Sequence, residues 1–154
     1  MAKAISHSNL NAELSAFSDA PHWYVAYSGG VDSTALLQLV NSWCKANGQA
    51  PPLTALYINH GLQAEADAWQ AHCEVLCAEL GVPLMCQRVE VATIGSLEAN
   101  ARLARYEVFA ECLGPRDRLL LAHHQQDQAE TGLFQLLRGH GAMGLFGMPQ
   151  ARSL

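Results

Sequence analysis

The sequence predicts an α/β fold, a doubly wound parallel sheet with helices on both faces. Short β-branched and aromatic segments alternate with longer amphipathic segments, and glycine or proline residues mark most of the boundaries. Such alternation gives parallel strands joined by right-handed crossovers. The chain has 154 residues, 50% of them hydrophobic and 15% charged, which suits one globular domain with a sizeable core.

The first strand and the first helix are expected at residues 23–27 and 32–46. The strand segment reads WYVAY and is rich in residues with high β-propensity. Four apolar residues in the helix segment have the i, i+3, i+4, i+7 spacing of a face that packs on a core: Leu36, Leu39, Val40 and Trp43. Gly48 and the two prolines that follow it end this helix.

Three further strands and three further helices follow in alternation. The strands are expected at residues 53–59, 83–91 and 118–122, and the helices at residues 67–80, 96–113 and 126–138. An apolar face of the second helix is expected from Trp69, Cys73, Leu76 and Leu80. Residues 1–20 are expected to form a short helical leader before a main domain of residues 21–150. Ligands of such sheets bind beyond the carboxyl ends of the strands, so the chemistry is expected there.

Composition narrows the classes of function. The net charge of −5 argues against a domain that binds nucleic acid by itself, since such domains usually carry a basic patch. The sequence shows neither a signal-peptide pattern nor an apolar run of membrane-spanning length, so a cytoplasmic protein without membrane contact is expected. Cys73, Cys77 and the adjacent His72 do not complete a four-ligand zinc site, and buried free thiols are expected instead.

The segment between the first strand and the first helix is suited to bind a phosphate or pyrophosphate group. Its residues are Ser28, Gly29, Gly30, Val31, Asp32, Ser33 and Thr34. Two adjacent glycines allow torsions that aim successive N–H groups at one point, and the start of the helix adds partial positive charge. Three hydroxyl groups add donors. The segment lacks the lysine of a Walker A loop, which argues against a kinase or a motor ATPase.

Asp32 is unusual beside a phosphate, because both groups are anionic. Its carboxylate could cap the first helix, since aspartate is a favoured N-cap residue. It could instead hold Mg²⁺, whose charge reverses the local electrostatics. The sequence leaves both interpretations open.

The motif S-G-G-x-D-S at residues 28–33 resembles the signature of the PP-loop ATP pyrophosphatases. Those enzymes split ATP between the α and β phosphates and leave an adenylated substrate and pyrophosphate. The resemblance implies the adenine nucleotide alpha hydrolase-like fold, ATP and Mg²⁺ as cofactors, and contact between the segment and ATP. The loop alone does not choose among synthetases, thiolases and lysidine synthases.

Three further segments resemble the N-terminal domain of the tRNA(Ile)-lysidine synthases. The first, N-H-G-L at residues 59–62, follows a strand that borders the adenine in that family, which implies that His60 binds ATP. His60 could equally be an ordinary loop histidine. The second, A-R-L-A-R-Y at residues 101–106, implies that Arg102 and Arg105 act at phosphate or tRNA. These arginines could instead belong to a solvated stripe of ion pairs with Glu98.

The third segment, H-H-Q-Q-D-Q-A-E-T at residues 123–131, implies that Asp127 and Glu130 bind Mg²⁺ or the lysine ammonium group. The family usually has aspartate where this chain has Gln126, and serine where it has His140. Both departures leave a neutral or weakly basic group, which weakens a strict two-carboxylate metal role. Asp32, Arg102 and Asp127 are the catalytic residues that the resemblance implies.

The resemblance implies ligation of L-lysine to the wobble cytidine of tRNA(Ile) with a CAU anticodon. The reaction would pass through an adenylated cytidine and release AMP and pyrophosphate, and a homodimer is possible. Family members are longer, so their C-terminal tRNA-binding domains are expected to be absent from a truncated chain such as this one. The alternatives are a PP-loop tRNA thiolase, which the absence of a C-x-x-C pair disfavours, and a non-catalytic nucleotide-binding module.

Overall fold

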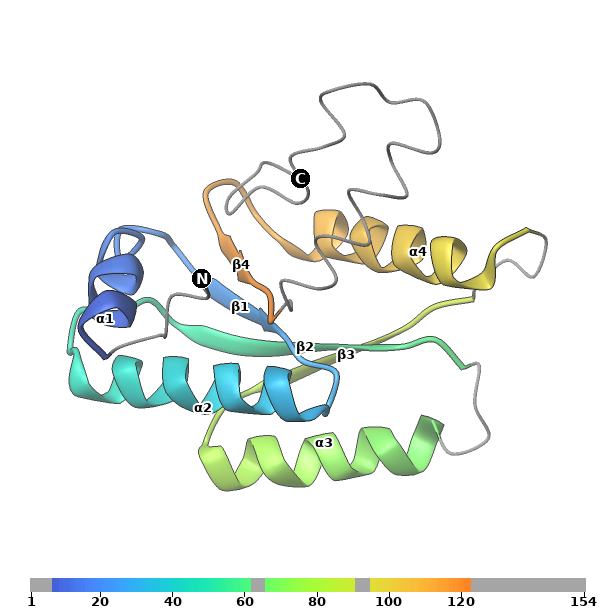
Figure 1. The fold of residues 1–154 in the computed structure, drawn as a ribbon, viewed down its shortest axis with the longest axis horizontal. Helices are drawn as coiled ribbons and strands as arrows, with labels where there is room; N and C mark the ends of the chain where they lie inside the picture. Colours follow the sequence, from blue (N-terminus) through green and yellow to red (C-terminus); the bar gives the residue numbers. More distant parts are fainter. Residues whose placement is uncertain (1–6, 62–65, 91–94, 123–154) are drawn as a thin grey trace, which may run out of the picture. The chain divides into compact units, whose positions relative to one another are not determined.

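The computed structural model describes residues 7–61, 66–90 and 95–122 of the chain, as shown in Figure 1. The contacts divide the chain into Met1–Leu121 and Ala122–Leu154, and all described residues except Ala122 belong to the first unit. The helix expected at residues 126–138 lies outside the described residues. Among the helices that are described, none is long and apolar enough to cross a membrane.

Four parallel strands form one sheet in the order β3-β2-β1-β4. The strands are β1 (Trp23–Ala26), β2 (Leu53–Asn59), β3 (Leu84–Arg88) and β4 (Arg118–Leu120). The helices are α1 (His7–Ser15), α2 (Val31–Ala46), α3 (Ala66–Leu80) and α4 (Leu97–Cys112). The α/β prediction is confirmed, and each described helix of the predicted alternation lies within one residue of its expected bounds at either end.

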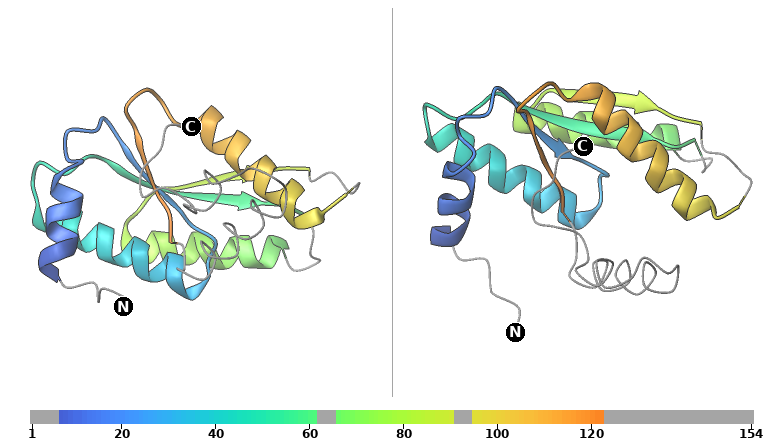
Figure 2. Two further views of the ribbon diagram at one scale, coloured as in Figure 1. Left: turned by 45° about the horizontal axis from the view of Figure 1, so that its top comes forward. Right: turned by 90° about the horizontal axis from the view of Figure 1, so that it is seen from above.

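The helices cover both faces of the sheet. Helices α2 and α3 lie on one face, whereas α4 crosses the opposite face, as Figure 1 and the two further views in Figure 2 show. The chain therefore winds outward from β1 through β2 to β3 and then returns through α4 to β4, on the other side of β1. The winding direction reverses at β1, and ligands of doubly wound sheets bind at the carboxyl end of such a reversal point.

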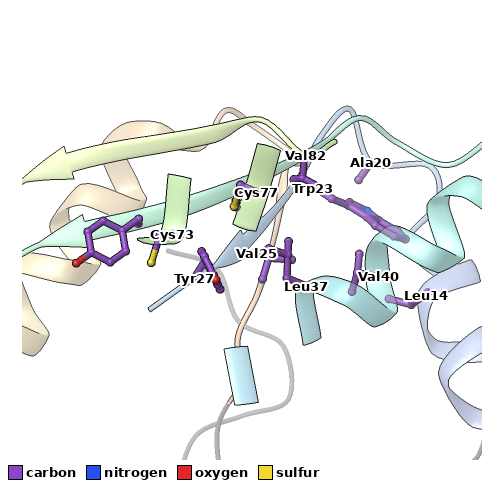
Figure 3. Close-up of a cluster of buried hydrophobic side chains, with 12 residues drawn as sticks. Leu14, Ala20, Trp23, Val25, Tyr27, Leu37, Val40, Cys73, Cys77 and Val82 are labelled. Carbon is purple, nitrogen blue, oxygen red and sulfur yellow. The ribbon is translucent and has the colours of Figure 1, made fainter. Parts of the chain in front are cut away.

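The main core lies between the sheet and helices α2 and α3. Alternate residues of β1 point into it, as expected of a strand, and Figure 3 shows Trp23 and Val25 there beside Leu37 and Val40 of α2. Cys73 and Cys77 of α3 complete this cluster and are buried, as predicted. Helix α1 lies within the segment expected as a leader and packs onto the same core through Leu14, which is 4% exposed.

Two of the predicted apolar faces are wrong in detail. Helix α2 buries Leu37 and Val40, whereas Leu39 is exposed and Leu36 is only half-buried. The buried stripe of α2 also contains the polar residues Ser33 and Asn41, which a search for apolar spacing cannot detect. In α3, Trp69 is about half exposed although it shares a helix face with the buried Cys73.

Three strands are shorter than expected, and the first of them, β1, ends at Ala26 rather than at residue 27. Strand β3 covers Leu84–Arg88 rather than residues 83–91, and β4 covers Arg118–Leu120 rather than residues 118–122.

The strand order places the β1–α2 loop at the reversal point of the sheet. The end of β2 extends beside it, because β1 and β2 are parallel and paired, with Ala26 opposite Leu56.

Candidate functional site

Residues 28–34, hereafter the 28–34 loop, follow β1 and include the first turn of α2, and the chain turns sharply at Gly29. The φ angle of Gly29 is +77°, which glycine adopts without the cost that a side chain would bring. Gly30 is the N-cap residue of α2, has an extended backbone and makes no side-chain cap hydrogen bond, and its N–H donates to the Ser28 hydroxyl at 3.4 Å. Backbone N–H groups at the start of a helix lack partners within the helix and favour anions. The 28–34 loop therefore presents donors at the reversal point of the sheet.

Hydrogen bonds between Ser28 and Ser33 hold the two ends of this turn together. The Ser33 hydroxyl is buried, accepts a hydrogen bond from the Ser28 N–H at 3.2 Å and donates to the Gly30 carbonyl at 3.1 Å. The Ser28 and Ser33 hydroxyl oxygens lie 3.0 Å apart. Thr34 directs its hydroxyl to the Tyr27 hydroxyl at 3.5 Å. Ser33 and Thr34 thus use their hydroxyls within the protein, and the exposed Ser28 carries its hydroxyl at the surface.

Asp32 lies in the first turn of α2 and is exposed. It is not the N-cap residue, because that position belongs to Gly30, so the capping interpretation is wrong. A carboxylate in the first turn interacts favourably with the helix dipole. Its neighbour Val31 is 85% exposed, although it is apolar.

The end of β2 is anchored by Asn59, which is only 1% exposed. Its amide group donates to Gln70 at 3.1 Å and to Asp67 at 3.3 Å, and its carbonyl oxygen accepts from the Gly61 N–H at 2.9 Å. Asn59 therefore joins the end of the strand, the turn after it and the first part of α3. The half-buried His60 sits within this turn.

His60 and Arg105 lie close enough to affect each other electrostatically. Burial lowers the pKa of His60, and the positive charge of Arg105 lowers it further, so the imidazole is neutral at pH 7. The His60 Nδ1 and the Arg105 Nε are buried and have no hydrogen-bond partner among the described residues. Two such nitrogens on different elements are suited to contact a polar ligand, because buried polar groups usually have partners.

Helix α4 presents both predicted arginines. Arg102 and Arg105 are half-buried, and the Arg105 guanidinium carbon lies 6.0 Å from the centre of the Tyr106 ring. Burial is the main effect lowering the pKa of Arg105, and the nearby Arg102 lowers it further. The guanidinium nevertheless stays charged, because arginine does not lose its proton in proteins.

Helix α3 contributes residues to the loop that the sequence reasoning assigned only to a core face. The Trp69 indole N–H donates to the Ser28 carbonyl at 2.8 Å. A Cβ atom placed on Gly29 would lie 2.7 Å from the Cys73 sulfur and 2.8 Å from the Trp69 indole nitrogen. The periodicity of α3 gave no signal for these contacts.

The cysteines do not provide reactive thiolates. All five are free, and burial raises the pKa of Cys73 and of Cys77 to about 11. Burial also raises the pKa of the other three thiols. Within the described ranges, no group of three or more His, Cys, Asp or Glu side chains could hold a metal ion. Asp127, Glu130, Gln126 and His140 lie outside those ranges.

Comparison with protein families gives a match to the PP-loop domain over residues 3–154. The chain is 50% identical over 147 residues to the tRNA(Ile)-lysidine synthase of Pseudomonas fluorescens, which covers 96% of this chain and 33% of that protein. It is 50% identical over 147 residues to that of Pseudomonas aeruginosa, with the same coverage. It is 41% identical over 146 residues to that of Haemophilus influenzae, covering 88% of this chain and 34% of that protein. The chain thus spans about a third of the length of these relatives.

A solved structure shares the fold. It is the U34-tRNA thiolase NcsA from Methanococcus maripaludis with its 4Fe–4S cluster, which matches with a TM-score of 0.58. The match covers 86% of this chain and 52% of that one, at 18% sequence identity. This likeness supports the arrangement of the sheet and helices alone.

Proposed function

This chain belongs to the PP-loop domain family, and on that premise we propose that its 28–34 loop binds the phosphates of ATP. The geometry of that loop carries the proposal. Gly29 turns the chain with a positive φ angle, Gly30 opens a 16-residue helix without a side-chain cap, and the turn is fixed by the Ser28 and Ser33 hydroxyls. Donors held in place before the ligand arrives need no reordering when it binds.

The proposed reaction is the activation of the wobble cytidine of tRNA(Ile) by ATP, followed by the attachment of lysine. ATP adenylates O2 of the cytosine and pyrophosphate leaves. The ε-amine of L-lysine then attacks C2 and AMP departs, which gives lysidine. The names of the relatives at 50% identity support this choice. The base must be unstacked for this chemistry, which a single-stranded anticodon loop permits.

Each residue of the site has a proposed role that fits its chemistry. Asp32 offers hard oxygen ligands beside the loop, so it would hold Mg²⁺ together with phosphate oxygens. Arg102 and Arg105 would neutralise developing phosphate charge, since the guanidinium group is always charged. The neutral His60 would contact the nucleotide at the end of β2. Asp127 is proposed to complete the catalytic set from outside the described ranges.

The chemistry of the thiols disfavours the thiolase alternative. A nucleophilic cysteine must be a thiolate, whereas the pKa values of Cys73 and Cys77 are raised to about 11 and those of the other three cysteines are also raised. None of these thiols is thus activated as a nucleophile. We further propose that residues 21–150 form the catalytic domain and that most of the tRNA-binding surface lies outside this chain.

The proposed function is tested by pyrophosphate release from ATP. The intact protein is supplied with tRNA(Ile), L-lysine and Mg²⁺, and each is omitted in turn. Release is expected to require tRNA(Ile) and Mg²⁺ but not lysine, because adenylation comes before lysine attack. Release that is independent of tRNA would contradict adenylation of the cytidine, and ATP binding without any release would favour the non-catalytic module.

A further inference from the structure

We propose that Trp69 is a positioning residue that holds the 28–34 loop in its phosphate-binding shape. The inference rests on the proposed function, because it takes this loop to bind the phosphates of ATP. It adds a residue from a different element, α3, whose contribution is a hydrogen bond to the loop backbone. Trp69 acts through the loop and is not itself expected to touch the reacting atoms.

The hydrogen bond fixes the orientation of one peptide plane. The Trp69 indole N–H donates to the Ser28 carbonyl at 2.8 Å, and this carbonyl belongs to the peptide that leads into Gly29. No peptide bond in the described chain is cis. In a planar trans peptide the C=O and N–H groups point in opposite directions. A Ser28 carbonyl held toward α3 therefore turns the Gly29 N–H away from α3.

The same contact supports the turn at Gly29. Gly29 lies directly against α3, since a Cβ there would be 2.7 Å from the Cys73 sulfur and 2.8 Å from the Trp69 indole nitrogen. Cys73 is fully buried and cannot give way without disturbing the core. Trp69 and Cys73 thus form the surface of α3 against which Gly29 of the loop packs.

Burial alone does not account for the position of Trp69. Trp69 is 48% exposed, whereas Trp23 is fully buried in the core. The ring instead packs beside the exposed His72, with 5.6 Å between the ring centres. The helix that carries Trp69 is in turn joined to the end of β2 through Asn59 and Gln70. One framework therefore positions both the loop after β1 and the turn after β2.

The test compares two substitutions that each remove one indole N–H from the intact protein. In Trp69→Phe, the KM for ATP in pyrophosphate release is expected to rise about tenfold, since one hydrogen bond to the loop is lost. Its kcat should change less, because the catalytic groups remain. The matched control is Trp43→Phe, which loses an indole hydrogen bond of 2.7 Å to Asn11, at the other end of α2 from the loop. This control should retain the wild-type KM.

A measurement on the wild-type protein keeps the test independent of how the variants fold. The indole N–H resonance of Trp69 is expected to shift in NMR spectra when Mg²⁺ and ATP are added, whereas that of Trp43 should stay in place. A Trp69→Phe variant with the KM of Trp43→Phe, or a Trp69 resonance that ATP leaves unmoved, would overturn the inference alone. A wild-type protein that binds no ATP would overturn the proposed function and this inference with it.

Discussion

Two separate constraints exclude a side chain at Gly29: its φ angle of +77° and the contact of α3. Gly29→Ala is therefore expected to weaken ATP binding and to destabilise the fold by about 2 kcal/mol or more, since backbone strain and overpacking each cost ~1–3 kcal/mol. Gly81→Ala separates the two effects, because Gly81 has a φ angle of +69° but open space around its Cβ position. Calorimetric ATP titration and thermal melts of both variants make the comparison.

The outcome that would contradict this account of Gly29 is equal stability of the two variants. It would mean that the contact with Trp69 and Cys73 costs nothing and that the torsion alone requires glycine. Gly48→Ala gives the baseline, because nothing lies within 4 Å of a Cβ placed there.

Asp32→Asn is expected to abolish pyrophosphate release while changing the free energy of unfolding by less than about 1 kcal/mol. The small stability effect follows from its position, because Asp32 is exposed and lies in the first turn of α2 rather than at the N-cap. Asp19→Asn is a suitable control. Asp19 is an exposed carboxylate before the amino end of β1, paired with Arg116 at 3.5 Å. Retained activity in Asp32→Asn would rule out the Mg²⁺ role.

At the scale of elements, Asn59 joins β2 to α3 through one buried amide. Asn59→Ala is expected to cost about 1–3 kcal/mol of stability, because it removes the three hydrogen bonds that the buried Asn59 amide makes. It should also weaken ATP binding, since α3 carries the residues that seat the 28–34 loop. Chemical denaturation and ATP titration measure the two effects.

Asn41→Ala provides the comparison for Asn59. The Asn41 side chain is also buried, and its amide donates to the Leu80 carbonyl at 3.0 Å, at the carboxyl end of α3. A similar loss of stability with unchanged ATP affinity is expected. If Asn41→Ala impaired ATP binding as much as Asn59→Ala, the effect of Asn59 on ATP binding would come from general destabilisation of the fold. It would not come from the connection between β2 and the first turns of α3.

The elements show what sequence reasoning could and could not supply. Strand and helix positions were predictable because apolar patterns and glycine or proline stops act locally. The buried face of α2 was not predictable from apolar spacing, because Ser33 and Asn41 are polar and their burial depends on specific hydrogen bonds. The loop was predictable from its motif. The role of Trp69 was not predictable from the sequence. Its hydrogen bond to Ser28 joins residues 41 positions apart and depends on how α3 packs.

The charge of the whole chain bears on RNA binding. The chain has nine Lys and Arg residues and fourteen Asp and Glu residues, so its net charge is negative. Contacts between basic side chains and phosphates dominate RNA affinity. This chain alone is therefore expected to bind tRNA weakly and without preference for tRNA(Ile). Filter binding of this chain and of a full-length tRNA(Ile)-lysidine synthase relative at matched salt tests the expectation, with thermal melts to confirm that this chain is folded. Equal affinity and equal preference would contradict it.

The order of the strands also has a consequence for how the chain folds. Trp23 pairs with Leu53 on one side but with Arg118 on the other, about a hundred residues later in the chain. Closing such a long loop is entropically costly, and folding slows as contacts become less local. During synthesis, β1 can pair with β2 early. The other edge of β1 stays unpaired until β4 has been synthesised. That unpaired edge of β1 is the place where a nascent chain would form non-native strand pairing with another chain.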